Sequence, residues 1–350
     1  MSETVFPTAG RALSVRMLEE ELNAVWKESV ARVPGARPGS DTGPITRAAL
    51  MTLVAVVDGK VAADRMTAMI AELTRQTPCR ALIVELDGGG ERATDHPGTA
   101  AEPLSAFASA HCHATSRGRP VCSEQITLRS TPDGDPHLSN LVLPLLLPDL
   151  PVVLHWPGVA SMMAPAGPPP HPLPRGAQFL CDLDPYVGQV ILDSTLAGNP
   201  EAYLANVLAL AERPAGPGMR PIDLNWVRLL PWRDALADAV DRCAIDVATI
   251  REARIESHPD DAGVMPVRPR LLAGWLRDRL RGTTGGAFRA WIDSAGPRGE
   301  SAPGRIIRLI LAMADGRELS IHVEQGTLAV SHGRDSFRFS RPAEDDHLLC

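Results

Sequence analysis

Apolar residues recur along the chain with two different periods, and each period predicts a kind of element. Steps of three and four residues through Leu18, Leu22 and Trp26 predict an amphipathic helix over 11–33. The Pro-Gly pair that follows ends this helix. A linker then continues to about residue 45, so the first 45 residues are expected to form an N-terminal helix and a linker.

The next segment has the pattern of a parallel-sheet unit. Residues 48–57 and 80–86 are nearly uninterrupted apolar runs, as expected of strands that are covered on both faces. Between them, 60–77 carries apolar residues at helical spacing. Strand, helix and strand in this order predict a βαβ unit and therefore an α/β domain.

Strict alternation of residue types follows over 106–114 and over 121–129, which predicts two strands joined as a hairpin. If the hairpin is symmetric about Arg117, Cys112 and Cys122 lie opposite each other. The favoured interpretation is two small buried thiols, because free cysteine packs as a small apolar residue. A redox-sensitive pair is the alternative hypothesis.

Strands and helices continue to alternate up to about residue 243. Seven prolines make 157–174 an irregular connection. The elements expected here are a helix capped by Asp135 and limited by Pro144 and Pro148, strands over 152–156, 188–193 and 224–230, and helices over 199–213 and 231–242.

Beyond this point the pattern changes to strands with few helices. A helix is expected over 269–281, and two further strands over 245–255 and 288–292. Four short strands joined by tight turns predict an antiparallel meander, at 305–314, 317–323, 327–331 and 336–340. We therefore predict a mixed-sheet α/β domain over 46–243, a smaller α+β domain with the meander over 244–340, and a tail over 341–350.

Composition and charge narrow the function classes. The 350 residues include 35 Lys and Arg against 42 Asp and Glu, a net charge of −7, which lacks the basic surface that nucleic acids require. The longest apolar stretch, 141–156, is too short and too rich in proline to cross a membrane. No secretion signal is evident, and the cysteines form no CxxC pair, so we expect a cytoplasmic protein with neither nucleic-acid nor membrane partners.

Two motifs are candidates for cofactor or metal binding. The glycines of 87–90 follow a strand but match no phosphate-binding pattern. His111 and His113 share a strand face, yet no further metal ligands accompany them. We found neither a nucleophile motif nor a pair of catalytic carboxylates. No cofactor, metal or catalytic residue is therefore expected.

Two segments contain candidate binding residues. Asp193 and Ser194 end a predicted buried strand, where α/β proteins place groups that contact ligands. A second group of aromatic and guanidinium side chains follows within eight residues: Trp226, Arg228, Trp232 and Arg233. Such residues dominate binding hot spots, but they serve equally as core anchors, and both interpretations stay open.

Several segments together resemble one known family. They are LPLLLPDLPV at 143–152, HWPG at 155–158, VILDS at 190–194, DLNWVRLLPWR at 223–233 and LLAGWL at 271–276. In this order they resemble the glucose-6-phosphate dehydrogenase assembly protein family, called OpcA.

The resemblance implies a protein that is not an enzyme. Its expected partner is glucose-6-phosphate dehydrogenase, whose active oligomer it would promote as an allosteric effector, supporting NADPH supply in the oxidative pentose phosphate pathway. The resemblance carries no catalytic residues. The alternative is a sugar-phosphate- or nucleotide-binding enzyme or sensor that uses the α/β domain, with Arg228 or Arg233 holding the phosphate.

Overall fold

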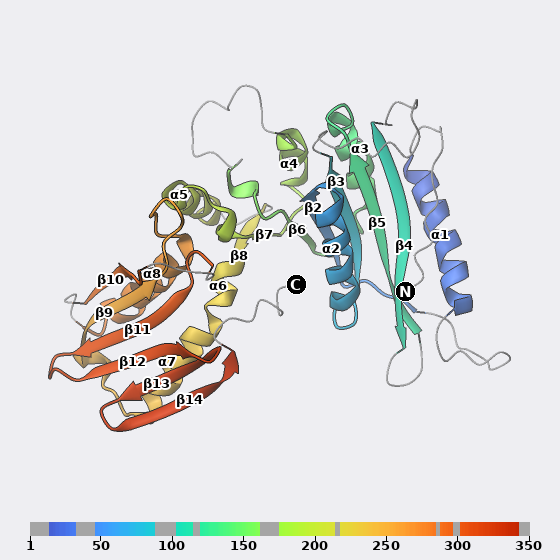
Figure 1. The fold of residues 1–350 in the computed structure, drawn as a ribbon. Helices are drawn as coiled ribbons and strands as arrows, with labels where there is room; N and C mark the ends of the chain where they lie inside the picture. Colours follow the sequence, from blue (N-terminus) through green and yellow to red (C-terminus); the bar gives the residue numbers. More distant parts are fainter. Residues whose placement is uncertain are drawn as a thin grey trace. The chain divides into compact units, whose positions relative to one another are not determined.

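The computed structural model describes residues 14–32, 46–87, 103–114, 120–161, 175–213, 218–284, 288–296 and 302–342 (Figure 1). The chain divides into two compact units. Unit 1 comprises Met1–Trp156, Ala166–Ile191 and Leu210–Pro221, and unit 2 comprises Pro157–Pro165, Leu192–Ala209 and Ile222–Cys350. The domain ranges expected from the sequence stay a prediction, because a compact unit need not be an independently folding domain.

The first sheet has the strand order β1-β5-β3-β2-β6-β7-β8, with β4 added antiparallel to β5. Its strands are β1 (Thr46–Arg47), β2 (Met51–Asp58), β3 (Cys79–Leu86), β4 (Leu104–Ala114), β5 (Pro120–Ser130), β6 (Val152–His155), β7 (Gln189–Leu192) and β8 (Arg220–Asp223). The pairs from β1 to β7 along this order are parallel. From β5 to β8 the order is that of doubly wound nucleotide-binding folds. The expected α/β class is confirmed.

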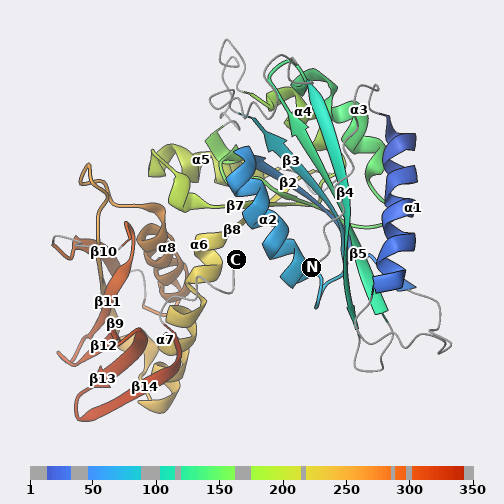
Figure 2. The ribbon, with the colours of Figure 1, turned by 45° about the vertical axis from the view of Figure 1, so that its right-hand side comes forward.

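Helices cover both faces of this sheet (Figure 2). The helical segments before β8 in the chain are α1 (Val15–Arg32), α2 (Gly59–Leu73), η1 (Asp135–His137), α3 (Leu138–Val142), η2 (Leu143–Leu145), η3 (Val159–Ser161), α4 (Ala177–Leu183), η4 (Ser194–Leu196) and α5 (Pro200–Ala211). Of these, η3, η4 and most of α5 belong to unit 2. On one face Met66 and Ile70 of α2 pack with Ile83 of β3. On the opposite face Arg80 of β3 donates to Glu19 of α1.

The expected cap of the helix after β5 is wrong. Asp135 is not the cap, because it is itself the first residue of η1. Its carboxylate instead accepts hydrogen bonds from Ser130 Oγ at 2.7 Å and from Arg175 Nε at 2.6 Å. An ion pair with a distant arginine thus replaces the local cap that the sequence pattern indicated.

The second sheet has the order β10-β9-β11-β12-β13-β14 and confirms the expected meander from β11 onward. Its strands are β9 (Ile250–Ser257), β10 (Arg289–Ser294), β11 (Ile306–Met313), β12 (Glu318–Glu324), β13 (Thr327–His332) and β14 (Asp335–Pro342). β10 lies parallel to β9. The turn between β12 and β13 places both Gln325 and Gly326 at positive φ, as a two-residue hairpin turn requires.

The helical elements of unit 2 after β8 are α6 (Leu224–Arg228), α7 (Leu230–Arg242), η5 (Val247–Thr249) and α8 (Val267–Arg281). α7 and α8 lie on the same side of the second sheet (Figure 2), where Trp232 and Leu276 share a core with Leu309. The expected strand over 224–230 is wrong, since this segment is α6 and the start of α7. No helix in the described segments has the length and apolar character needed to cross a bilayer.

Candidate functional site

Polar side chains gather in unit 2 where β7 and β8 end, and three candidates named from the sequence, Asp193, Ser194 and Arg228, are among them. Asp193 and Ser194 follow β7 directly, and Asp223 is the last residue of β8 and the N-cap of α6. The segment 225–233 follows as helix. The structure therefore brings together the two candidate segments, whose Asp193 and Arg228 are 35 residues apart in the sequence.

Asp223 is the centre of this network. Its Oδ1 accepts from Ser194 Oγ at 2.9 Å and from the Asn225 backbone amide at 2.8 Å. Its Oδ2 accepts from the Tyr203 hydroxyl at 2.8 Å. Asn225 Nδ2 in turn donates to Ser194 Oγ at 2.8 Å. One carboxylate thus ties η4, α5 and the first turn of α6 together.

A second carboxylate fixes the end of α6. Arg228 donates from its two terminal nitrogens to Asp193 at 2.8 and 3.0 Å, and this bidentate geometry is the strong form of the pair. Asp193 also accepts from the Thr195 backbone amide and hydroxyl. The side chains of Asp193 and Arg228 are 14% and 13% exposed, so the pair is largely removed from water. Arg268 of α8 joins the network through Asn225 Oδ1 at 2.7 Å.

The environment shifts the acid–base behaviour of three of these groups. Burial raises the pKa of Asp193, but the bonds from Arg228 and Thr195 outweigh it and leave a net pKa below the ordinary value. Burial raises the pKa of Asp223 above its ordinary value despite its donors. The pKa of Tyr203 is raised by burial first and by the Asp223 charge second.

These groups satisfy one another and present no accessible nucleophile. Ser194 is 2% exposed, and its hydroxyl donates to Asp223. Both terminal nitrogens of Arg228 bind Asp193. The position that a bound phosphate would take in the alternative hypothesis is therefore occupied by a carboxylate of the protein itself. The network is suited to holding α6 in place.

The other three contact candidates differ in burial: one lies in the core, and two are partly exposed. Trp232 is 2% exposed and belongs to the unit 2 core. The Arg233 guanidinium lies 3.9 Å from the centre of the Trp226 ring, and it donates to the Trp226 carbonyl at 3.2 Å. Both residues of this stack are only partly buried. Of the residues named from the sequence, Trp226 and Arg233 are therefore the ones whose geometry suits a contact surface.

Sequence reasoning missed two residues beside this stack. Val227 is 37% exposed and Leu230 is 42% exposed, so two large apolar side chains next to the stack are open to solvent. Their spacing of three residues would have placed them on one helix face, had 224–230 been assigned as helix and not as strand.

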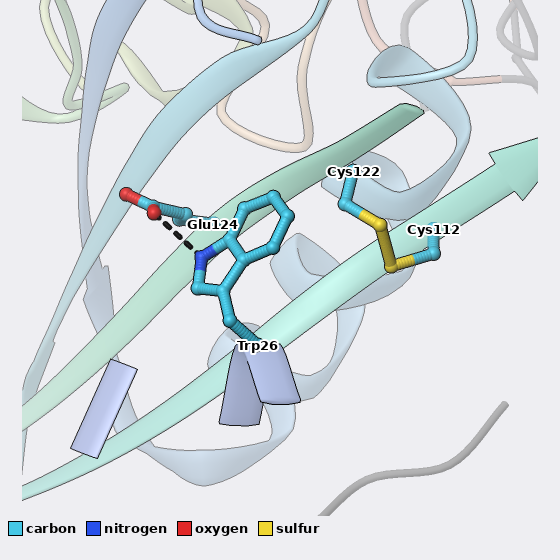
Figure 3. The surroundings of a disulfide bond; sticks show 4 residues. All are labelled: Trp26, Cys112, Cys122 and Glu124. Atoms are coloured by element: carbon cyan, nitrogen blue, oxygen red, sulfur yellow. Dashed lines mark hydrogen bonds between the residues drawn. A yellow bond between two sulfur atoms is a disulfide. The ribbon is translucent and has the colours of Figure 1, made fainter. Parts of the chain in front are cut away.

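The β4–β5 hairpin places Cys112 directly opposite Cys122, as the sequence predicted. The favoured interpretation of two separate thiols is wrong, because these residues form a disulfide (Figure 3). Trp26 of α1 lies beside it and donates from Nε1 to Glu124 at 2.7 Å. Whether the pair responds to redox conditions stays a prediction.

The remaining motifs gain no support as sites. His111 Nε2 lies 2.9 Å from Gln125 Oε1, a hydrogen bond within the hairpin. The side chain of His113 and the glycines 88–90 lie outside the described residues, as do most of the proline-rich segment and the tail. Where the structure is described, no three histidine, cysteine or acidic residues are grouped to hold a metal ion.

Comparison with known sequences gives matches over both parts of the chain. Residues 70–209 match the family described as the glucose-6-phosphate dehydrogenase subunit N-terminal domain, and residues 220–344 match its C-terminal domain. The second range contains α6, α7 and the whole second sheet.

The chain is also similar to curated proteins that are provisionally named OxPP cycle protein OpcA. It is 32% identical to that of Synechocystis sp. over 135 residues, which are 38% of this chain and 25% of the relative. The protein of Nostoc punctiforme is 26% identical over 60% of this chain and 39% of its own length. The protein of Synechococcus elongatus is 27% identical over 59% of this chain and 41% of its own length. The chain thus spans well under half the length of these relatives.

Proposed function

The chain belongs to the OpcA family of glucose-6-phosphate dehydrogenase assembly proteins, and from this premise we propose that it is a non-catalytic partner of that dehydrogenase. It binds the enzyme in the cytoplasm, promotes the active oligomer and acts as an allosteric activator in the oxidative pentose phosphate pathway. The observation that carries the proposal is the family match over both parts of the chain. The consequence of this activation is a larger supply of NADPH.

The physical basis of the activation is differential binding. A protein that binds the active oligomer more tightly than the inactive form shifts the equilibrium by the difference between the two binding free energies. Such an effector needs a contact surface and no catalytic group. The mutual hydrogen bonding of Ser194, Tyr203 and Asp223 supports a role without turnover, since the donors and acceptors in question are already engaged.

A titration tests the proposal. Glucose-6-phosphate dehydrogenase of the same organism is held at low concentration with fixed glucose 6-phosphate and NADP⁺, and the full chain is added. We expect the rate to rise together with the appearance of a faster-sedimenting complex. An unchanged rate and no co-sedimentation over the whole titration would overturn the proposal.

Thermal unfolding of the same protein preparation tests the alternative function, a sugar-phosphate- or nucleotide-binding protein. Thermal unfolding of the chain alone is followed with glucose 6-phosphate, 6-phosphogluconate or NADP⁺ added. A partner protein shows little change with any of them, whereas a small-molecule binder melts at a higher temperature in proportion to ligand occupancy.

A further inference from the structure

The segment from α6 to α7 has the geometry of one continuous helical surface. The Leu229 amide donates to the Asn225 carbonyl at 3.1 Å, and the Arg233 amide donates to the Leu229 carbonyl at 3.1 Å. These two bonds continue the helical pattern across the junction. Residues three and four positions apart therefore share a face here, which groups Trp226, Val227, Leu230 and Arg233.

This face combines apolar exposure with a fixed position. Val227 and Leu230 present their side chains to solvent, and the Trp226–Arg233 stack lies beside them. Underneath, the Asp193–Arg228 pair anchors the helix end. A surface that is already held in one conformation loses little entropy when it binds.

Arg233 gives the face a positive charge and a hydrogen-bond donor without a partner. The Arg233 Nε is buried without a hydrogen-bond partner, and the adjacent Asp234 is the carboxylate whose charge acts on this guanidinium. Burial lowers the pKa of Arg233 although the charge of Asp234 opposes the shift, and the side chain is partly buried. A carboxylate of a partner could pair with this guanidinium. Because the guanidinium is already partly buried, pairing would remove less water from it than from a fully exposed arginine.

We propose that Trp226, Val227, Leu230 and Arg233 form the surface that docks glucose-6-phosphate dehydrogenase, and that the occupant is an apolar side chain of that enzyme flanked by an Asp or Glu. The inference rests on the proposed function and assigns it a site. The apolar side chain covers Val227 and Leu230, and the carboxylate pairs with Arg233. Tryptophan and arginine at the centre of such a contact are the residue types that carry most binding energy.

Three single variants test the surface. Leu230→Ser removes the apolar contact, and Arg233→Gln removes the charge. Leu208→Ser is the matched control, because Leu208 is a leucine of α5 in the same unit with 56% exposure. Binding of each full-length variant to the dehydrogenase is measured by sedimentation, and thermal unfolding verifies the fold.

We expect Leu230→Ser and Arg233→Gln each to weaken binding by about tenfold or more, and the control to bind like the wild type. If Arg233→Gln unfolds, Leu230→Ser carries the test, since an exposed position changes stability little. Wild-type binding that both variants retain would overturn this surface and leave the proposed function standing. A wild type that does not bind overturns both. A melting temperature that glucose 6-phosphate raises in the wild type but not in Arg233→Gln would assign Arg233 to a small anion and overturn the docking role.

Discussion

At the scale of single residues, loss of the Asp193–Arg228 pair should lower the free energy of unfolding most. Asp193→Asn keeps the shape but leaves one acceptor oxygen for Arg228 and Thr195, and it removes the negative charge that faces the largely buried Arg228 guanidinium. We expect the free energy of unfolding to fall by about 3 kcal/mol, measured by urea denaturation. Asp293→Asn is the control, because the Arg254–Asp293 pair is about half exposed and should leave the midpoint nearly unchanged. Equal effects of the two variants would contradict the assignment.

The same pair predicts the pH dependence of stability. The folded pKa of Asp193 lies below its ordinary value of 3.8, so the unfolded chain takes up the proton first as the pH falls. The stabilisation is therefore complete above the ordinary pKa and is lost as the pH falls through the folded one. We expect the wild type to lose more unfolding free energy than Asp193→Asn between about pH 5 and about pH 3. Asp223, whose pKa is shifted upward and whose contribution is lost as the pH rises, is present in both proteins and so largely cancels in the comparison.

At the scale of elements, the Cys112–Cys122 disulfide links β4 to β5. Peptide mapping without reductant should find the two residues in one linked peptide, with Cys181, which is exposed, alkylated. Cys112→Ser/Cys122→Ser should lower the unfolding free energy by about 2–3 kcal/mol, because the short loop is no longer closed in the unfolded chain. Full alkylation of both residues in the unreduced protein would contradict the pairing.

How well each element could be predicted depends on how much local pattern it carries. The unit β2–α2–β3 and the meander were predictable, because long apolar runs and turn residues at fixed offsets leave few alternatives. The segment 224–230 was not, since a short apolar run fits a strand as well as a buried helix. Asp223 was the missed signal, as its carboxylate caps α6.

Some members of the candidate site were predictable, but their roles were not. The sequence named Asp193, Ser194 and, between Trp226 and Arg233, four aromatic and arginine side chains as candidates. It could not say that Trp232 faces the core while Leu230 faces solvent, because that depends on which side of α7 meets the second sheet. Burial is set by packing between distant segments, and one sequence does not reveal that packing.

At the scale of the whole molecule, an assembly role predicts how activation depends on the dehydrogenase concentration. A partner that acts by favouring the oligomer can raise activity only by assembling what is not yet assembled. If about 1% of the enzyme is oligomeric alone, the largest possible activation is about 100-fold, and if about half is oligomeric it is about twofold. We therefore expect the activation by saturating chain to decline as the enzyme concentration rises, in step with the oligomeric fraction that sedimentation of the enzyme alone reports. Leu230→Ser should need more protein to reach the same plateau at each concentration. A constant activation factor across that range would mean that the chain acts on an oligomer already formed, which would retain the allosteric effect and remove the assembly role.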